Sequence, residues 1–343
     1  MMNYIKKKIL HPLKMGWYNF LIATFGAWNF FCKQQKRQEM YLTEKFYKER
    51  SSSLVSNDIV FTCNDFIWSG GLADRLKGII AVYDWCNRNN RPFKINFCSP
   101  FRLQDYLIPN EVKWVPDNVC YDKEKTVVRT CLMEPRTCNK KEVIKHQDEL
   151  LEEWMDKNLK DTDKQIHIYS NMYRLNVDFS NCFQKLFKPC SRLQEELVYH
   201  KMQIGGQYIS ISFRFTTLLG DFTDCTGAPL LEAEREQYIT TCLEAVNSIR
   251  ATAPAHHRIL ITADSSTFLS RVQQTPGVYV IPGKVGHIDY DSGDDVNMKT
   301  FLDFLMIADA KAVYLVKHGR MYGSAFAKTA ACVHNRPFHI FEC

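Results

Sequence analysis

The run YISISFRF, at Tyr208–Phe215, decides the fold class of this chain. Its residues are almost all β-branched, aromatic or small, which is typical of a strand buried on both faces of a parallel sheet. Comparable runs follow at 258–263 (RILITA), 278–281 (VYVI), 312–316 (AVYLV) and 337–341 (PFHIF). The segments between them have helical length and spacing, so the sequence predicts an α/β fold in which helices cover a parallel sheet.

The chain before Gly205 shows the same pattern less regularly. Strands are expected at 58–63 and 92–97, on either side of a helix over 72–88. We expect residues 99–165 to be irregular apart from a helix near 141–158, and residues 183–202 to be helical. Gly205–Gly206 marks the expected boundary, and the predicted parts are an arm at 1–50, an amino-terminal domain at 51–204 and a carboxy-terminal domain at 205–343.

Composition excludes several classes of protein. A length of 343 residues favours about two domains. The hydrophobic fraction of 45% and the charged fraction of 24% are ordinary for a globular protein, which argues against disorder, collagen and coiled coil. The thirteen cysteines include no CxxC pair, so they do not suggest a zinc framework.

Positive charge is concentrated in the amino-terminal arm. Residues 1–50 hold ten Lys or Arg residues and three Glu residues, whereas the net charge of the whole chain is only +6. This distribution argues against a nucleic-acid partner, which would need a basic face on the folded body. Residues 16–32 are apolar and aromatic, and they lie between Lys6–Lys8 and Lys33–Arg37.

Three interpretations of the arm stay open. In the first, residues 1–40 form a helix that lies on an anionic membrane surface, which would make the protein cytoplasmic and peripherally membrane-associated. In the second, the apolar stretch is a signal anchor of a type II membrane protein. In the third, the segment packs on its own catalytic domain.

Four segments have the residue types of a ligand site at the carboxyl ends of strands. The turn at 69–76 (SGGLADRL) carries Gly70 and Gly71 before a helix start, and Arg75 lies one turn further on. Arg214 ends the strand YISISFRF, where a planar and permanently charged fork suits a diphosphate. Each segment also has a purely structural explanation, such as a tight turn for Gly70 or a carboxylate partner for Arg214.

The other two segments follow later strands. Asp264 and Ser265 come directly after the strand at 258–263, where Asp264 suits either a ligand site or a helix N-cap. The segment 318–327 (HGRMYGSAFA) follows the strand at 312–316, and its small residues at a helix start can cradle a phosphate or allow close packing on the sheet.

Together the four segments resemble the superfamily of α1,2-, α1,6- and protein O-fucosyltransferases. The run GGLADR at 70–75 resembles the glycine-rich turn of that family, and ISFR at 211–214 resembles its arginine-bearing strand. TADS at 262–265 is similar to its acidic segment, and DFLM at 303–306 and GSAFA at 323–327 resemble its last two blocks. The similarity covers residues 58–335, although the matching blocks are short.

The resemblance implies a GT-B fold, in which two Rossmann-like domains face each other across a cleft. It implies inverting transfer of fucose from GDP-fucose to a glycan hydroxyl, with no metal and no cofactor. Arg214 would stabilise the leaving diphosphate. A general base should take the acceptor proton, and Asp74, Asp221 and Asp224 are the candidates, among which the sequence does not choose. Donor-binding residues carried over by position are Gly70, Gly71, Arg75, Asp264, Ser265, Asp303, Gly323, Ser324, Ala325 and Phe326.

The chain departs from the family pattern near Arg214. Ser212 stands where the family often has His, and the expected Gly-Asp pair is displaced to Gly220-Asp221. Two other functions therefore stay open. One is a metal-dependent GT-A-type glycosyltransferase that uses the DxD matches at 161–163 and 289–291. The other is a catalytically inert subunit that binds a glycan or a nucleotide.

Overall fold

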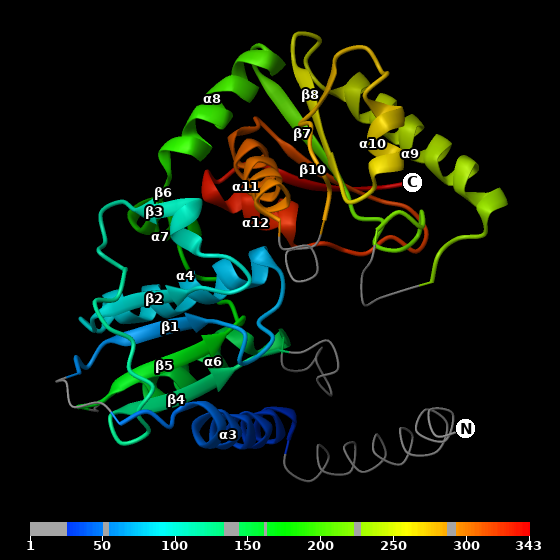
Figure 1. The fold of residues 1–343 in the computed structure, drawn as a ribbon. Helices are drawn as coiled ribbons and strands as arrows, with labels where there is room; N and C mark the ends of the chain where they lie inside the picture. The colour runs from blue at the N-terminus through cyan, green and yellow to red at the C-terminus, as the bar shows by residue number, and fades with distance from the viewer. Residues whose placement is uncertain (1–25, 51–54, 134–143, 161–162, 223–227, 287–292) are drawn as a thin grey trace, which may run out of the picture. The chain divides into compact units, whose positions relative to one another are not determined.

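The computed structural model shows two compact units (Figure 1). It describes residues 26–50, 55–133, 144–160, 163–222, 228–286 and 293–343. Unit 1 comprises the described residues of Met1–Gly70, Asp74–Phe97 and Trp114–Val177, and unit 2 comprises Gly71–Ala73, Cys98–Lys113 and Asp178–Cys343.

Unit 1 is built on a four-stranded parallel sheet with strand order β2-β1-β5-β4. The strands are β1 (Ile59–Cys63), β2 (Phe93–Phe97), β4 (Thr126–Cys131) and β5 (Gln165–Ser170). The helices are α4 (Leu72–Arg88) and α6 (Gln147–Asn158). The predicted strands and helix before residue 98 are confirmed. At Gly78, α4 runs so close to the sheet that a Cβ there would collide with the backbone carbonyl of Ser170.

The prediction of irregular structure over 99–165 is wrong, because β4 lies inside that range and β5 begins at its end. All six residues of β5 are buried, yet several of them are polar. His167 Nδ1 lies 2.8 Å from the Tyr47 hydroxyl and its Nε2 lies 2.7 Å from Gln165 Oε1. Burial lowers the pKa of His167 to about 3, so the ring is neutral. Because its buried polar side chains hydrogen-bond to one another, β5 does not have the run of hydrophobic residues by which a buried strand is predicted.

The described part of the arm belongs to unit 1. Helix α3 (Ala27–Phe46) packs on the edge strand β4 and buries Phe31 and Leu42. Its Gln35 amide accepts from Leu132 N–H at 2.9 Å and its Glu39 carboxylate accepts from Thr130 N–H at 2.9 Å. Residues 27–46 therefore form a helix that packs on unit 1 and caps two backbone N–H groups beside the edge strand, while most of the apolar stretch 16–32 lies outside the described residues.

Residues 1–25 lie outside the described part of the chain. Within the described residues, no helix combines the length and the apolar character that a membrane crossing requires.

Unit 2 is built on a five-stranded parallel sheet with strand order β11-β10-β7-β8-β9. The strands are β7 (Tyr208–Phe213), β8 (Arg258–Ala263), β9 (Val278–Val280), β10 (Val313–Lys317) and β11 (Phe338–Glu342). The helices between them are α9 (Glu232–Thr252), α10 (Ser266–Val272), α11 (Asp294–Asp309) and α12 (Phe326–Val333). The alternation predicted after residue 205 is confirmed.

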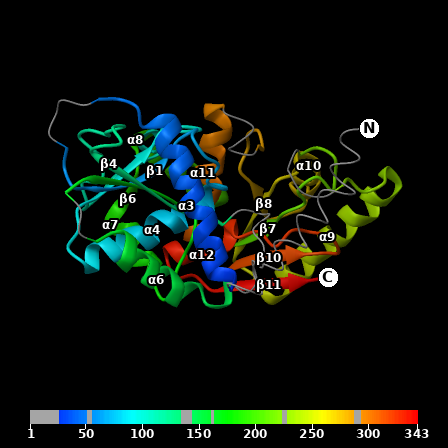
Figure 2. The same ribbon diagram turned by 90° about the horizontal axis from the view of Figure 1, so that it is seen from below.

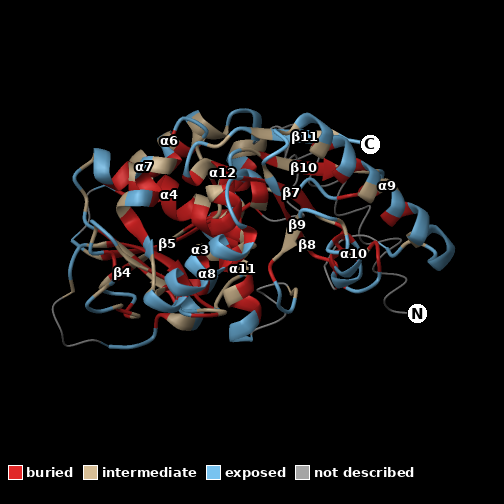
Figure 3. Cartoon of the chain, turned by 90° about the horizontal axis from the view of Figure 1, so that it is seen from above, coloured by how far each residue is buried: buried red, intermediate tan, exposed pale blue. Residues whose placement is uncertain are grey.

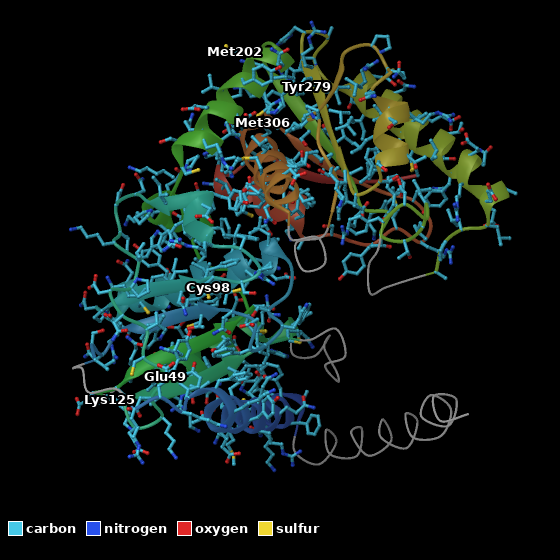
Figure 4. All side chains as sticks on the ribbon, viewed as in Figure 1. Glu49, Cys98, Lys125, Met202, Tyr279 and Met306 are labelled. Carbon is cyan, nitrogen blue, oxygen red and sulfur yellow. The ribbon has the colours of Figure 1, made fainter. Side chains whose placement is uncertain are left out.

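Helices cover both faces of this sheet. Ile211 and Phe213 of β7 pack in a core with residues of α9 and α10. On the other face the Tyr208 hydroxyl donates to the carbonyl of Met306 on α11 at 2.8 Å. Met306 is labelled in Figure 4. Figure 2 shows α9 and α12 on opposite sides of the strands. Figure 3 shows α9 buried on one side and exposed on the other, as expected of an outer helix.

Residues 178–204 group with unit 2, whereas the sequence places them before the domain boundary. Helix α7 (Phe179–Leu186) contacts α12, and α8 (Ser191–Ile204) contacts α11. The helix expected over 183–202 is interrupted by a short strand, β6 (Phe187–Pro189). This strand pairs antiparallel with β3 (Leu107–Pro109), which follows the 3₁₀ turn η2 (Leu103–Asp105).

Candidate functional site

The chain changes direction between two neighbouring strands of unit 2. From β7 it leads to α9 on one face of the sheet, and from β10 it leads to α12 on the opposite face (Figure 2). In open parallel sheets, ligands bind beyond the carboxyl ends of the strands at such a switch point. The residues that follow β7 and β10 are therefore the first candidates for a site, and they include Arg214 and the segment 318–326.

Arg214 is the first residue after β7. Its carbonyl accepts a hydrogen bond from Tyr322 N–H at 3.2 Å, which ties it to the loop after β10. Its Nη1 lies 3.0 Å from Asp264 Oδ2, and its guanidinium lies over the ring of Phe222 with 5.0 Å between Cζ and the ring centroid. The side chain remains 21% exposed, and Asp264 and Phe222 orient its guanidinium.

Asp264 organises the turn that follows Arg214. Its two carboxylate oxygens accept from Phe215 N–H at 2.7 Å and from Thr216 N–H at 2.8 Å. Thr216 has φ +56°, a left-handed conformation that is strained for a β-branched residue. Burial raises the pKa of Asp264, while Arg214 and the two N–H groups act in the opposite direction by stabilising the anion.

The N-cap of α10 is Ser265 rather than Asp264. Its side chain accepts from Phe268 N–H at 3.1 Å. The helix-capping explanation considered for Asp264 is therefore wrong, because its carboxylate is directed to the turn after β7.

Asp221 is bound to the start of α10. One of its oxygens accepts from Thr267 N–H at 2.8 Å and from the hydroxyls of Ser265 and Ser266 at 2.9 and 3.1 Å. Burial raises the pKa of this carboxyl, but the hydrogen bonds outweigh burial and the pKa lies below its ordinary value. An anion stabilised in this way is a weak proton acceptor.

The low pKa of Asp221 predicts acid-sensitive stability. Its contribution is present above the ordinary Asp pKa of about 4 and is lost as the pH falls through the lower folded value. We expect Asp221→Ala to lower the free energy of unfolding by about 1 kcal/mol at pH 7. That difference should shrink below pH 4, as measured by urea unfolding across pH. A difference that is constant down to pH 3 would show that the carboxylate charge contributes nothing.

The loop after β10 leads into α12 through small residues. A Cβ added at Gly323 would have no atom of the protein within 4 Å. Ser324 Oγ accepts from Phe326 N–H at 3.2 Å, and Ala325 is the N-cap of α12. This helix start and Arg214 lie at the same edge of the sheet, since Tyr322 links the two segments. Ser324 N–H already donates to the Tyr322 carbonyl at 2.9 Å, so an anion placed there would depend on the N–H groups of Gly323 and Ala325 and on the cation.

Asp303 does not join this arrangement through its carboxylate. Its two oxygens accept from the buried Lys299 ammonium at 2.8 and 2.7 Å, one turn earlier on α11. The resemblance gave Asp303 a donor-binding role and did not take account of Lys299, four residues earlier on the same helix.

The remaining candidates lie in the turn at the start of α4, where Gly70, Asp74 and Arg75 group with unit 1 and Gly71 groups with unit 2. Gly70 has φ +85°, and its carbonyl accepts from Arg75 Nε at 2.7 Å. The Arg75 side chain is buried, with its guanidinium over Phe97. Asp74 pairs with Lys77 at 2.7 Å and is 42% exposed, and Gly71 has open space where a Cβ would stand.

Several acidic candidates cannot be placed. Asp289 and Asp291, which form the second DxD match, lie outside the described residues, as do Asp161 of the first match and Asp224, a further possible base. Among the residues that are described, no group of three His, Cys, Asp or Glu side chains has the arrangement of a metal site.

Sequence reasoning missed Thr216, Phe222 and Tyr322. The aromatic character of Phe222 and its place after Gly220-Asp221 gave a weak signal. Nothing in the sequence marks Thr216 as left-handed, and the backbone contact of Tyr322 does not depend on its side chain.

Comparison with known proteins supports the fold. No family model matches the chain, and no curated protein matches it. Among solved structures, NodZ α-1,6-fucosyltransferase soaked with GDP-fucose aligns with TM-score 0.53 and 15% identity over 81% of this chain and 93% of that one. NodZ from Bradyrhizobium also aligns with TM-score 0.51 and 14% identity over 80% and 92%.

A plant structure is similar to the same degree. A mutant of Arabidopsis thaliana FUT1 in complex with GDP aligns with TM-score 0.53 and 8% identity over 90% of this chain and 74% of that one. At these identities the likeness establishes the fold, so the predicted GT-B-like α/β class is confirmed.

Proposed function

We propose that the chain is an inverting, metal-independent glycosyltransferase that moves fucose from GDP-fucose to a hydroxyl of a glycan. One observation carries the proposal: Tyr322 N–H donates to the Arg214 backbone carbonyl, which holds Arg214 and the segment before α12 at one edge of the sheet, at its switch point. Support comes from the shared fold, because proteins with that fold were crystallised with GDP-fucose or GDP.

The proposed roles follow from the charges that the reaction develops. As the sugar leaves, negative charge grows on the departing diphosphate, and Arg214 neutralises it. The N–H groups of Gly323 and Ala325 hold the phosphates, and Asp264 orients Arg214. A base must take the proton of the acceptor hydroxyl. Hydrogen bonds keep Asp221 a weak base, which leaves Asp74 and Asp224 as the other candidates.

The decisive experiment is a thermal-shift panel of nucleotide sugars. The full chain is heated with GDP-fucose, GDP-mannose or UDP-galactose, each with and without EDTA. We expect GDP-fucose to raise Tm the most, with no effect of EDTA, because a ligand that binds only the folded state stabilises it. Loss of the shift in EDTA would favour the metal-dependent alternative. A shift without transfer or hydrolysis would favour the inert subunit.

Gly323→Ala tests the phosphate cradle. The added methyl group meets no protein atom within 4 Å, so Tm should change little. If phosphate lies against this backbone, the methyl group occupies ligand space, and KM for GDP-fucose should rise about tenfold. Isothermal titration with GDP checks binding directly. Unchanged affinity in a stable variant would place the phosphates elsewhere.

A membrane partner for residues 1–40 is the second part of the proposal. The outer side of α3 exposes the cations Lys33, Lys36 and Arg37, and beside them Met40 and Tyr41 are 63% and 53% exposed. Near an anionic surface each such cation contributes about 1 kcal/mol. This face suits a protein that lies peripherally on the cytoplasmic side of a membrane, with a signal anchor as the alternative.

Co-sedimentation with vesicles tests this surface. We expect the chain to bind phosphatidylglycerol vesicles and not phosphatidylcholine vesicles. The combined change Lys33→Glu, Lys36→Glu and Arg37→Glu should abolish binding, and so should high salt, which screens the charges. If the triple variant binds as well as the original chain, α3 is not the contact.

A further inference from the structure

Unit 2 contains a groove that the proposed function does not use. We call it the α9 groove. It has a volume of about 720 Å³ and lies between the first turns of α9 and the loop after β10. Its polar lining comprises Glu234, Gln237, Tyr238, Thr241, His318 and Arg320, and the apolar residues before α9 complete one wall. This volume is within the range of small-molecule sites.

The two walls of the α9 groove are fastened to each other. The Tyr238 hydroxyl donates to the His318 carbonyl across 80 residues of sequence, and the two rings are in edge contact with centroids 4.6 Å apart. His318 Nδ1 also lies 2.6 Å from the carbonyl oxygen of Cys343. Gly319 has φ +49° and sits against the Tyr238 ring. These contacts make the groove a preformed site.

The chemistry of the groove suits a neutral, hydroxyl-rich ligand. Glu234 accepts hydrogen bonds, Arg320 donates them, and the Gln237 amide does both. The negative charge of Glu234 balances the positive charge of Arg320. The groove lining therefore has no net positive charge that would favour a phosphate or sulfate ligand. The half-buried His318 ring adds an apolar surface on which the C–H face of a sugar can pack, while Tyr238 is only 9% exposed and supports that ring from behind.

The groove shares a loop with the candidate donor site. Arg320 is two residues from Tyr322, whose N–H bonds to the Arg214 carbonyl. Two residues of extended chain span at most about 7 Å. The groove therefore opens beside the edge of the sheet where the diphosphate is proposed to bind.

From these observations we infer that the α9 groove is a saccharide subsite that holds sugar units of the glycan acceptor. The inference rests on the proposed function. It places acceptor contacts on the same unit as the proposed donor site.

The test measures saccharide binding without any donor present. The full chain is titrated with maltotetraose, cellotetraose and chitotetraose, and binding is followed by saturation-transfer difference NMR. Gln237→Ala removes an exposed amide of the groove, and Gln237→Trp fills the groove. Asn247→Ala is the matched control, because it removes an exposed amide of α9 away from the groove.

We expect at least one of the three oligosaccharides to bind. Both Gln237 variants should weaken that binding tenfold or more, while Asn247→Ala leaves it unchanged and GDP raises Tm equally in all four proteins. Equal saccharide affinity in Gln237→Trp and the original chain overturns the inference, and so does the absence of binding by all three at 10 mM. If a saccharide binds but GDP-fucose does not raise Tm, the saccharide subsite stands and the proposed GDP-fucose donor is wrong.

Discussion

Replacing Arg214 with alanine should lower kcat for fucosyl transfer by about 10²–10³, with a smaller effect on the KM for GDP-fucose. The guanidinium is proposed to meet charge that grows only as the diphosphate departs, so its loss raises the barrier more than it weakens ground-state binding. A factor of this size corresponds to about 3–4 kcal/mol. Arg214→Lys should recover only part of the rate, because an ammonium cannot contact two phosphate oxygens with one planar fork.

The matched control is Arg271→Ala. Arg271 is also an arginine of unit 2, but it is 52% exposed and pairs with Glu236 on the surface. Its removal should change neither Tm nor kcat by much, because exposed pairs contribute little. Transfer at the original rate in a folded Arg214→Ala protein would remove Arg214 from the mechanism and, with it, the main argument for a transferase.

The fold was predictable where hydrophobic runs are uninterrupted. β7, β8 and β10 are buried parallel strands of apolar residues, and their bounds agree with the prediction to within one or two residues. β5 was not recognised, because His167 and Gln165 are polar and only the folded chain shows that they bond each other and Tyr47. The helix α3 was read as part of a membrane arm, since its edge-capping bonds from Gln35 and Glu39 are long-range contacts.

The sequence predicted which segments lie at the candidate site, but it did not predict which side chains contact one another there. Arg214 and the small residues at 323–326 do meet at one edge of the sheet, because parallel strands bring their carboxyl ends together. The partners of each side chain were not visible in the sequence. Asp264 and Asp303 read alike as acidic residues near a strand or helix, yet one holds the turn after Arg214 and the other pairs with Lys299.

Asp264→Asn should separate orientation of Arg214 from mere support of the fold. The asparagine keeps the shape but loses the charge and one acceptor, so two backbone N–H groups and one guanidinium compete for a single oxygen. We expect the free energy of unfolding to fall by about 2–3 kcal/mol. We also expect kcat to fall 10- to 100-fold at a temperature where the variant is fully folded.

The decisive measurement is a double-mutant cycle. If Asp264 acts through Arg214, Asp264→Asn should have almost no further effect on kcat in the Arg214→Ala protein, because residues that act as a unit are not additive. Thr216→Gly supplies the control for strain: glycine adopts φ +56° readily, so stability should hold or rise while the Asp264–Arg214 pair stays intact. If the reductions in kcat caused by Asp264→Asn and Arg214→Ala multiply in the double variant, Asp264 does not act through Arg214. It would then have a separate contact with the substrate.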